Sequence, residues 1–303
     1  MLRNKFFILF ISVLLIGACK NKEFKNKYII LNDGWRFKLG DSIKWANVNY
    51  NDINWNKFNF ANVARNDTFK TYDGYGWYRI KFFIPSILKS NAYTKEYFKI
   101  SLGAIDDCDQ VYLNGNMIGE NTITVSRNYK PDNNFEKAPG LWDKNRTYIL
   151  AAEDTRILWD RKNTLSVRIY DQGGNGGLTT QVPTISMCGL EDYISIDTSR
   201  FYKEGPNGFL RREVIIKNTL KTTLNGGLSI AAVNTETKQS VYNSSVQVSV
   251  SSMGSEIIQI KLPVSTDPTI VIFKLKDNAS NYVVNKTETI PYVLADIKYK
   301  NAN

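Results

Sequence analysis

The sequence contains no histidine in its 303 residues. This absence excludes Ser-His-Asp triads, Cys-His pairs and histidine acid–base catalysis, and it removes most types of zinc site. Any acid–base chemistry would have to rest on carboxylates, lysine or tyrosine. Long segments with an apolar period of 3.6 residues are also missing, and parallel α/β folds need such helices.

Cysteine is scarce, with Cys19, Cys108 and Cys188 as the three copies. Export would permit a disulfide between Cys108 and Cys188, but sequence spacing does not show whether the two residues are close enough to bond. Two buried free thiols are the interpretation that we favour.

The chain contains 43% hydrophobic and 22% charged residues, a composition typical of globular proteins. Its 13% aromatic residues favour β-strands. The formal net charge is +10, but the lysines and arginines are scattered and form no basic run. We therefore interpret the charge as a solvated basic surface and expect no nucleic-acid partner.

The first 18 residues are typical of a lipoprotein signal peptide. Arg3 and Lys5 precede an apolar run over residues 6–16, which is short for a membrane span of about 20 residues. The run ends in Leu-Ile-Gly-Ala before Cys19, a pattern that resembles a lipobox. We expect lipidation of Cys19, a polar tether over residues 19–27, and attachment to the bacterial cell envelope, most simply the outer membrane at its periplasmic or surface face.

Period-two alternation dominates the remainder and predicts half-buried strands. Ile80, Phe82 and Ile84 alternate with other residues, and residues 98–102 and 165–170 repeat this pattern. Asn114-Gly115 after a strand-like segment is a strong hairpin signal, because both residues tolerate positive φ.

The sequence changes character near residues 191–199, since no tryptophan follows Trp159. Short strands are expected over residues 213–217, 228–233, 246–250, 258–262 and 269–275, separated by turns at residues 224–227 and 277–280. About seven short strands in roughly 100 residues are typical of an immunoglobulin-like sandwich. The prediction is an all-β chain, with one sandwich over residues 28–195 and an immunoglobulin-like sandwich over residues 196–303.

Four motifs in the first domain carry a resemblance to a known family. They are residues 34–41 (GWRFKLGD) with 50–55 (YNDINW), residues 72–79 (YDGYGWYR), residues 102–119 (LGAIDDCDQVYLNGNMIG), and residues 163–171 (NTLSVRIYD) with the glycine-rich 173–178. Together they resemble the galactose-binding-like jelly roll at the front of glycoside hydrolase family two enzymes, a module also found in sialate O-acetylesterases. The second domain is similar in a general way to the immunoglobulin-like domain that follows it in those hydrolases.

The catalytic parts of these families have no counterpart in the sequence. The hydrolases continue into a (β/α)₈ barrel, which takes about 250 further residues. The esterases use a Gly-Asp-Ser nucleophile with a histidine, and the Gly40-Asp41-Ser42 of this chain has no histidine to activate the serine. We therefore expect a hydrolase-related protein that is not itself an enzyme.

Asp106, Asp107 and Asp109 form an acidic cluster beside a predicted strand. They could make structural hydrogen bonds, contact a ligand, or hold a structural Ca²⁺, the one cofactor that we consider. Sequence neighbours do not flank a glycosidic bond, so an acid/base pair is not expected.

Aromatic residues in predicted loops are candidates for stacking on sugar rings, with packing as the alternative for each. The predicted carbohydrate-binding set is Tyr72, Tyr75, Arg127, Tyr129, Trp142 and Trp159. In contrast, Trp35, Trp55 and Trp77 are expected to lie in the core.

Three functional hypotheses follow. The leading one is a carbohydrate-binding accessory lipoprotein with a glycan as partner. The second is an accessory subunit or degenerate front end of a glycoside hydrolase that works with a separate catalytic chain. The third is a structural envelope protein without a ligand.

Overall fold

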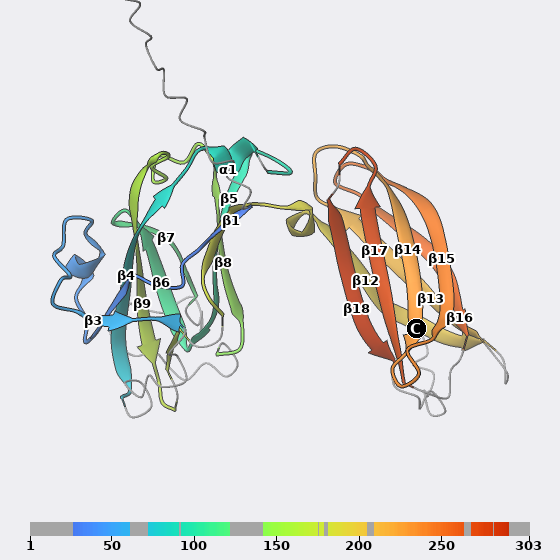
Figure 1. Ribbon diagram of the computed structural model, residues 1–303, viewed down its shortest axis with the longest axis horizontal. Helices are drawn as coiled ribbons and strands as arrows, with labels where there is room; N and C mark the ends of the chain where they lie inside the picture. The colour runs from blue at the N-terminus through green and yellow to red at the C-terminus, as the bar shows by residue number, and fades with distance from the viewer. Residues whose placement is uncertain are drawn as a thin grey trace, which may run out of the picture.

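The computed structural model describes residues 27–60, 72–90, 92–121, 142–174, 176–178, 181–204, 209–263, 268–280 and 282–290. Every strand pairing in these ranges is antiparallel, and the strands form four sheets arranged as two sandwiches (Figure 1). The predicted all-β class is confirmed.

The first sandwich consists of a five-stranded and a six-stranded sheet. The five-stranded sheet contains β1 (Tyr28–Ile30), β11 (Thr184–Met187), β5 (Tyr97–Asp106) and β10 (Gly177–Leu178) in that order, with β8 (Asn145–Ala151) also paired to β5. The six-stranded sheet has the order β3 (Asn56–Phe58), β2 (Trp35–Leu39), β4 (Gly74–Ile84), β9 (Arg161–Asp171), β6 (Cys108–Leu113) and β7 (Asn116–Asn121).

The main core of this sandwich follows from the period-two alternation. Ile80 and Phe82 of β4 lie beside Leu165 and Val167 of β9 in one apolar cluster between the sheets. Strands β6 and β7 meet at Asn114-Gly115, where φ is 52° and 85°, so the predicted hairpin is confirmed.

The second sandwich contains the seven remaining strands. One sheet has the order β12 (Ile194–Glu204), β13 (Phe209–Asn218) and β16 (Ser255–Pro263), and the other β15 (Ser240–Val250), β14 (Leu224–Asn234), β17 (Thr269–Asp277) and β18 (Val283–Ile290). Buried and less buried residues alternate along β14 and β17, which is the pattern of strands with one face on a core.

One predicted turn is wrong. Residues 224–227 were expected to separate two strands because they contain Asn-Gly-Gly, but they form the beginning of the central strand β14. A Cβ at Gly226 would lie 2.5 Å from the carbonyl oxygen of Lys276 on β17. Gly226 therefore permits close approach of the β17 backbone, and the segment does not reverse the chain.

The two sandwiches have separate apolar clusters, which divide between Met187 and Leu190. This division lies a few residues before the predicted boundary between residues 195 and 196. The short 3-10 helix η4 (Leu190–Asp192) occupies the junction (Figure 1). Lys99 of β5 contacts Asp192 at 2.6 Å, so an ion pair ties the first sandwich to this connection.

The remaining helical elements of the described residues are the 3-10 helix η1 (Ile43–Ala46) and the helix α1 (Ile87–Ser90). No helix in the described part of the chain is long and apolar enough to cross a membrane. Cys108 and Cys188 are buried free thiols, as favoured from the sequence.

Candidate functional site

The outer face of the six-stranded sheet carries an unusual set of large polar and aromatic side chains. The same alternation that turns Tyr78 and Ile80 toward the core places Tyr75, Trp77 and Arg79 of β4 on the opposite face. Their neighbours across the sheet are Tyr170, Arg168 and Ser166 of β9, followed by Cys108, Gln110 and Tyr112 of β6.

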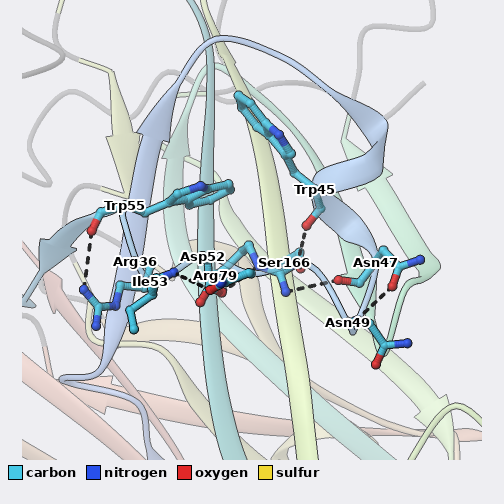
Figure 2. Close-up of polar contacts among 10 residues, drawn as sticks. Arg36, Trp45, Asn47, Asn49, Asp52, Ile53, Trp55, Arg79 and Ser166 are labelled. Carbon is cyan, nitrogen blue, oxygen red and sulfur yellow. Dashed lines mark hydrogen bonds and ion pairs between the residues drawn. The ribbon is translucent and has the colours of Figure 1, made fainter.

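Arg79 holds the segment of residues 41–55 against one half of this face. Figure 2 shows its guanidinium between this segment and the sheet. Its Nε donates to Asp52 Oδ2 at 2.8 Å, its Nη1 donates to Ser166 Oγ at 2.9 Å and to the carbonyl of Trp45, and its Nη2 donates to the carbonyl of Asn47 at 3.2 Å. Because Arg79 has no exposed surface, its charge depends on these partners.

An aromatic cluster fills the space between this segment and the sheet. Trp77 stacks on Tyr112 with a ring separation of 5.7 Å, and Trp45 meets Trp55 edge-on at 5.2 Å. Trp55 and Trp77 are 5% and 0% exposed in this cluster, and Trp35 is 1% exposed in the main core between the sheets, so the predicted burial of all three is confirmed. This half of the face is therefore closed to a ligand.

The other half of the face contains a shallow hollow, whose space of about 170 Å³ includes open solvent. Its lining residues are Tyr75, Cys108, Asp109, Gln110, Arg168, Ile169 and Tyr170. The rings of Tyr75 and Tyr170 are half-buried, and their centroids lie 4.7 Å apart. The guanidinium of Arg168 lies over the Tyr75 ring, 4.3 Å from its centroid.

Arg168 is held rigidly in this hollow. Its Nε and Nη2 donate to the two carboxylate oxygens of Asp41 at 2.8 and 2.6 Å, and its Nη1 donates to Gln110 Oε1 at 2.8 Å. Trp77 Nε1 also donates to Asp41, at 2.9 Å. Burial opposes the charge on Asp41, but these hydrogen bonds outweigh burial and lower the pKa of the Asp41 carboxyl.

The hollow has the chemistry of a small polar–apolar binding site. The C–H face of a sugar ring can stack on half-buried tyrosines, while fixed polar groups such as Arg168 and Gln110 bond its hydroxyls. The hollow is shallow and partly open to solvent, so a sugar ring would lie against its surface rather than inside an enclosed pocket.

A group of carboxylates adjoins the hollow at the end of β9. One oxygen from each of Asp106, Asp107 and Asp171 lies within 4.8 Å of the others. Burial, a hydrogen bond with Asp107, and the charges of Asp107 and Asp171 together raise the pKa of Asp106 to about 7. Asp171 follows Tyr170 directly on β9, so its side chain points to the inner face of the sheet at the end of the strand where the hollow lies on the outer face.

Asp109 does not belong to this group, although it was predicted to join Asp106 and Asp107. It lies on the inward face of β6, where its carboxylate accepts from Arg146 Nε at 2.6 Å and from the Tyr148 hydroxyl. The third member of the group is Asp171, which lies 62 positions after Asp109 in the sequence. Asp106 ends β5 of the five-stranded sheet and Asp109 lies within β6 of the six-stranded sheet, so closeness in sequence did not bring the aspartates together.

The predicted carbohydrate-binding residues lie in different places. Tyr75 lines the hollow, whereas Tyr72 and Trp159 are half-buried and pack against the main core. Trp159 Nε1 donates to the carbonyl of Ala152 at 3.0 Å. Trp142 is 59% exposed.

Arg127, Tyr129 and the lipidation residue Cys19 lie outside the described residues. Arg168 and Tyr170, on the other hand, are part of the hollow and were not predicted as site residues. The alternation of apolar and polar residues in the sequence could have identified them, because both occupy outward-facing positions of β9.

Fold and site together define a jelly-roll sandwich with an aromatic and polar hollow, followed by an immunoglobulin-like sandwich. Solved glycoside hydrolases share this fold. A β-glucuronidase of Bacteroides uniformis matches with a TM-score of 0.56 and 15% identity, over 87% of this chain and 32% of that one. A glycosyl hydrolase family 2 member from Bacteroides cellulosilyticus matches with a TM-score of 0.54 and 14% identity, over 88% of this chain and 36% of that one.

A putative β-galactosidase from Bacteroides fragilis matches with a TM-score of 0.52 and 16% identity, over 87% of this chain and 40% of that one. The chain thus spans about a third of the length of these enzymes, and the likeness concerns the fold. The resemblance expected from the four motifs is confirmed at that level. Comparisons of the sequence with family models and with curated proteins find no match.

Proposed function

We propose that this protein is a non-catalytic carbohydrate-binding lipoprotein of the bacterial cell envelope, and that the glycan binds in the hollow formed by Tyr75, Arg168 and Tyr170. The observation that carries the proposal is the clamped Arg168 guanidinium over the half-buried Tyr75 ring. Such an arrangement offers an apolar stacking surface and fixed hydrogen-bonding groups at one place, without reorganisation on binding.

The carboxylates support binding rather than hydrolysis. Glycosidases separate their two catalytic carboxyl groups by about 5–5.5 Å or about 6.5–9.5 Å. One oxygen from each of Asp106, Asp107 and Asp171 lies within 4.8 Å of the others. Asp109 and Asp41 each form an ion pair with an arginine.

A second candidate function is that of an accessory subunit beside a separate glycoside hydrolase chain. It is favoured by the fold match, which covers only a third of each enzyme. The two functions are compatible, because a glycan-binding subunit would hold the substrate for the catalytic chain. Co-purification of a glycoside hydrolase with the tagged lipoprotein is the result that would favour this candidate.

The proposed function is tested with a glycan panel. The chain from residue 20 onward should bind at least one class of oligosaccharide or polysaccharide in isothermal titration calorimetry and affinity electrophoresis. The same samples should show no new reducing ends after prolonged incubation. Absence of binding across the panel, or turnover at enzymatic rates, would contradict the proposal.

The anchor is tested separately. Cys19→Ser is expected to abolish incorporation of labelled palmitate and to release the protein from the membrane fraction, because the acyl chains supply about 0.8 kcal/mol per buried CH₂. Cys108→Ser is the matched control, and it should label like the wild type. Equal labelling of the Cys19→Ser variant and the wild type would refute lipidation at this residue.

A further inference from the structure

The carboxylate group at the end of β9 contains a buried oxygen without a hydrogen-bond partner. Asp171 has no exposed surface, and its Oδ1 accepts from the Gly173 N–H at 2.9 Å. Its Oδ2 is buried and has no hydrogen-bond donor among the residues that the structure describes. Burial of an unpaired carboxylate oxygen is costly, and such atoms in folded proteins call for a partner that the protein alone does not supply.

Gly176 packs directly against this oxygen. A Cβ at Gly176 would overlap Asp171 Oδ2, so any other residue at that position would displace the carboxylate. The loop that follows β9 is fixed in place, because the Gln172 N–H donates to Asp107 Oδ2 at 2.9 Å. Asp171 and Asp107 are thus held at a set separation by the backbone.

The local charge is unbalanced. Arg146 is the cation that acts on Asp106; its Nε donates to Asp109 at 2.6 Å, and its Nη2 donates to the carbonyls of Ile105 and Asp107 at 2.9 and 2.7 Å. Arg146 therefore braces the backbone under Asp106 and Asp107, while the carboxylates of Asp106, Asp107 and Asp171 converge on one another.

We infer that Asp106, Asp107 and Asp171 form a Ca²⁺ site beside the hollow. Ca²⁺ binds oxygen ligands at about 2.3–2.6 Å, so oxygens on opposite sides of one ion lie up to about 5 Å apart. One oxygen from each aspartate lies within 4.8 Å of the others, so the three can share one Ca²⁺. Mg²⁺ usually keeps several waters and is rarely bound by a cage of protein ligands alone, which favours Ca²⁺ here.

Three carboxylates supply up to six oxygens, and Asp106 and Asp107 are only half-buried, so water can complete the coordination shell. The ligand set contains no nitrogen or sulfur, which disfavours zinc. The site differs from the three neighbouring aspartates of the sequence, since it includes Asp171 and excludes Asp109. The ion would give the buried Oδ2 of Asp171 the partner that it lacks.

The experiment uses the chain from residue 20 onward, stripped with EDTA and titrated with CaCl₂ in a calorimeter. We expect one Ca²⁺ per chain and a rise in melting temperature with Ca²⁺ concentration. Asp171→Asn preserves shape but removes the charge, and it is expected to weaken Ca²⁺ binding by at least about tenfold. Asp33→Asn, which alters an exposed carboxylate outside the group, should bind Ca²⁺ like the wild type.

Terbium luminescence provides a second readout, because Tb³⁺ substitutes for Ca²⁺ and is sensitised by nearby tyrosines such as Tyr170. The signal should be lost in Asp171→Asn while circular dichroism shows an intact fold. Absence of Ca²⁺ binding by the folded wild type, or unchanged binding by Asp171→Asn, would overturn the site. No glycan enters this experiment, so its failure would leave the proposed carbohydrate-binding function standing.

Discussion

Replacing Tyr75 with alanine is expected to weaken glycan binding by about 30-fold. Truncation of a central aromatic contact costs about 2 kcal/mol, and every 1.4 kcal/mol corresponds to a factor of ten. Tyr75 supplies both the stacking surface and the support on which the Arg168 guanidinium lies. Tyr75→Phe keeps the ring and should retain most of the affinity.

Two alanine variants serve as controls in this experiment. Tyr28→Ala removes a tyrosine that is 51% exposed on the other sheet, and it should bind the glycan like the wild type. Trp142→Ala removes the most exposed of the predicted stacking residues in the described structure. Calorimetry with the glycan identified in the panel distinguishes a site at Tyr75 from a site at Trp142. Loss of binding in Trp142→Ala but not in Tyr75→Ala would show that the glycan does not bind in the hollow.

The largest loss of stability is expected from Arg146→Leu. The Arg146 and Asp109 side chains are 1% and 0% exposed, so the substitution leaves a buried carboxylate without its cation. Breaking one partner of a buried pair costs about 3–5 kcal/mol. Urea denaturation should therefore show a greatly reduced free energy of unfolding, or a chain that does not fold.

The double variant Asp109→Leu/Arg146→Leu should recover much of this loss, because it removes both charges. Arg156→Met is the matched control: Arg156 bonds Asp154 at 2.6 Å, but the two side chains are 31% and 17% exposed. Exposed pairs contribute about 0–1 kcal/mol, so this variant should unfold almost like the wild type. Equal destabilisation by Arg146→Leu and Arg156→Met would show that burial does not decide the cost.

The Arg146→Leu variant should also gain a pH dependence. Burial already raises the pKa of Asp109, against the opposing hydrogen bonds from Tyr148 and Arg146, and loss of Arg146 raises it further. A group with a raised folded-state pKa favours the fold below its unfolded pKa and loses that contribution as pH rises through the folded value. The variant should thus be more stable at mildly acidic pH than at alkaline pH, which denaturation at two pH values can measure.

Several features of this protein could be predicted from local sequence. Asn114-Gly115 forms its hairpin because both residues accept positive φ, a property of the residues themselves. The alternation of Leu165, Val167 and Ile169 sets which face of β9 is buried, since successive side chains point to opposite faces. The local pattern was misleading where a neighbouring strand packs closely, as at residues 224–227, where Gly226 accommodates the backbone of β17.

The sequence by itself determined the all-β class, the two sandwiches and the burial of Trp35, Trp55 and Trp77, because these depend on side-chain period and apolar surface. Only the tertiary structure decided which residues meet at the site. Asp41 reaches Arg168 across 127 positions, and Asp171 replaces Asp109 beside Asp106. Strand register makes these choices, and register depends on the packing of the whole sheet rather than on any one segment.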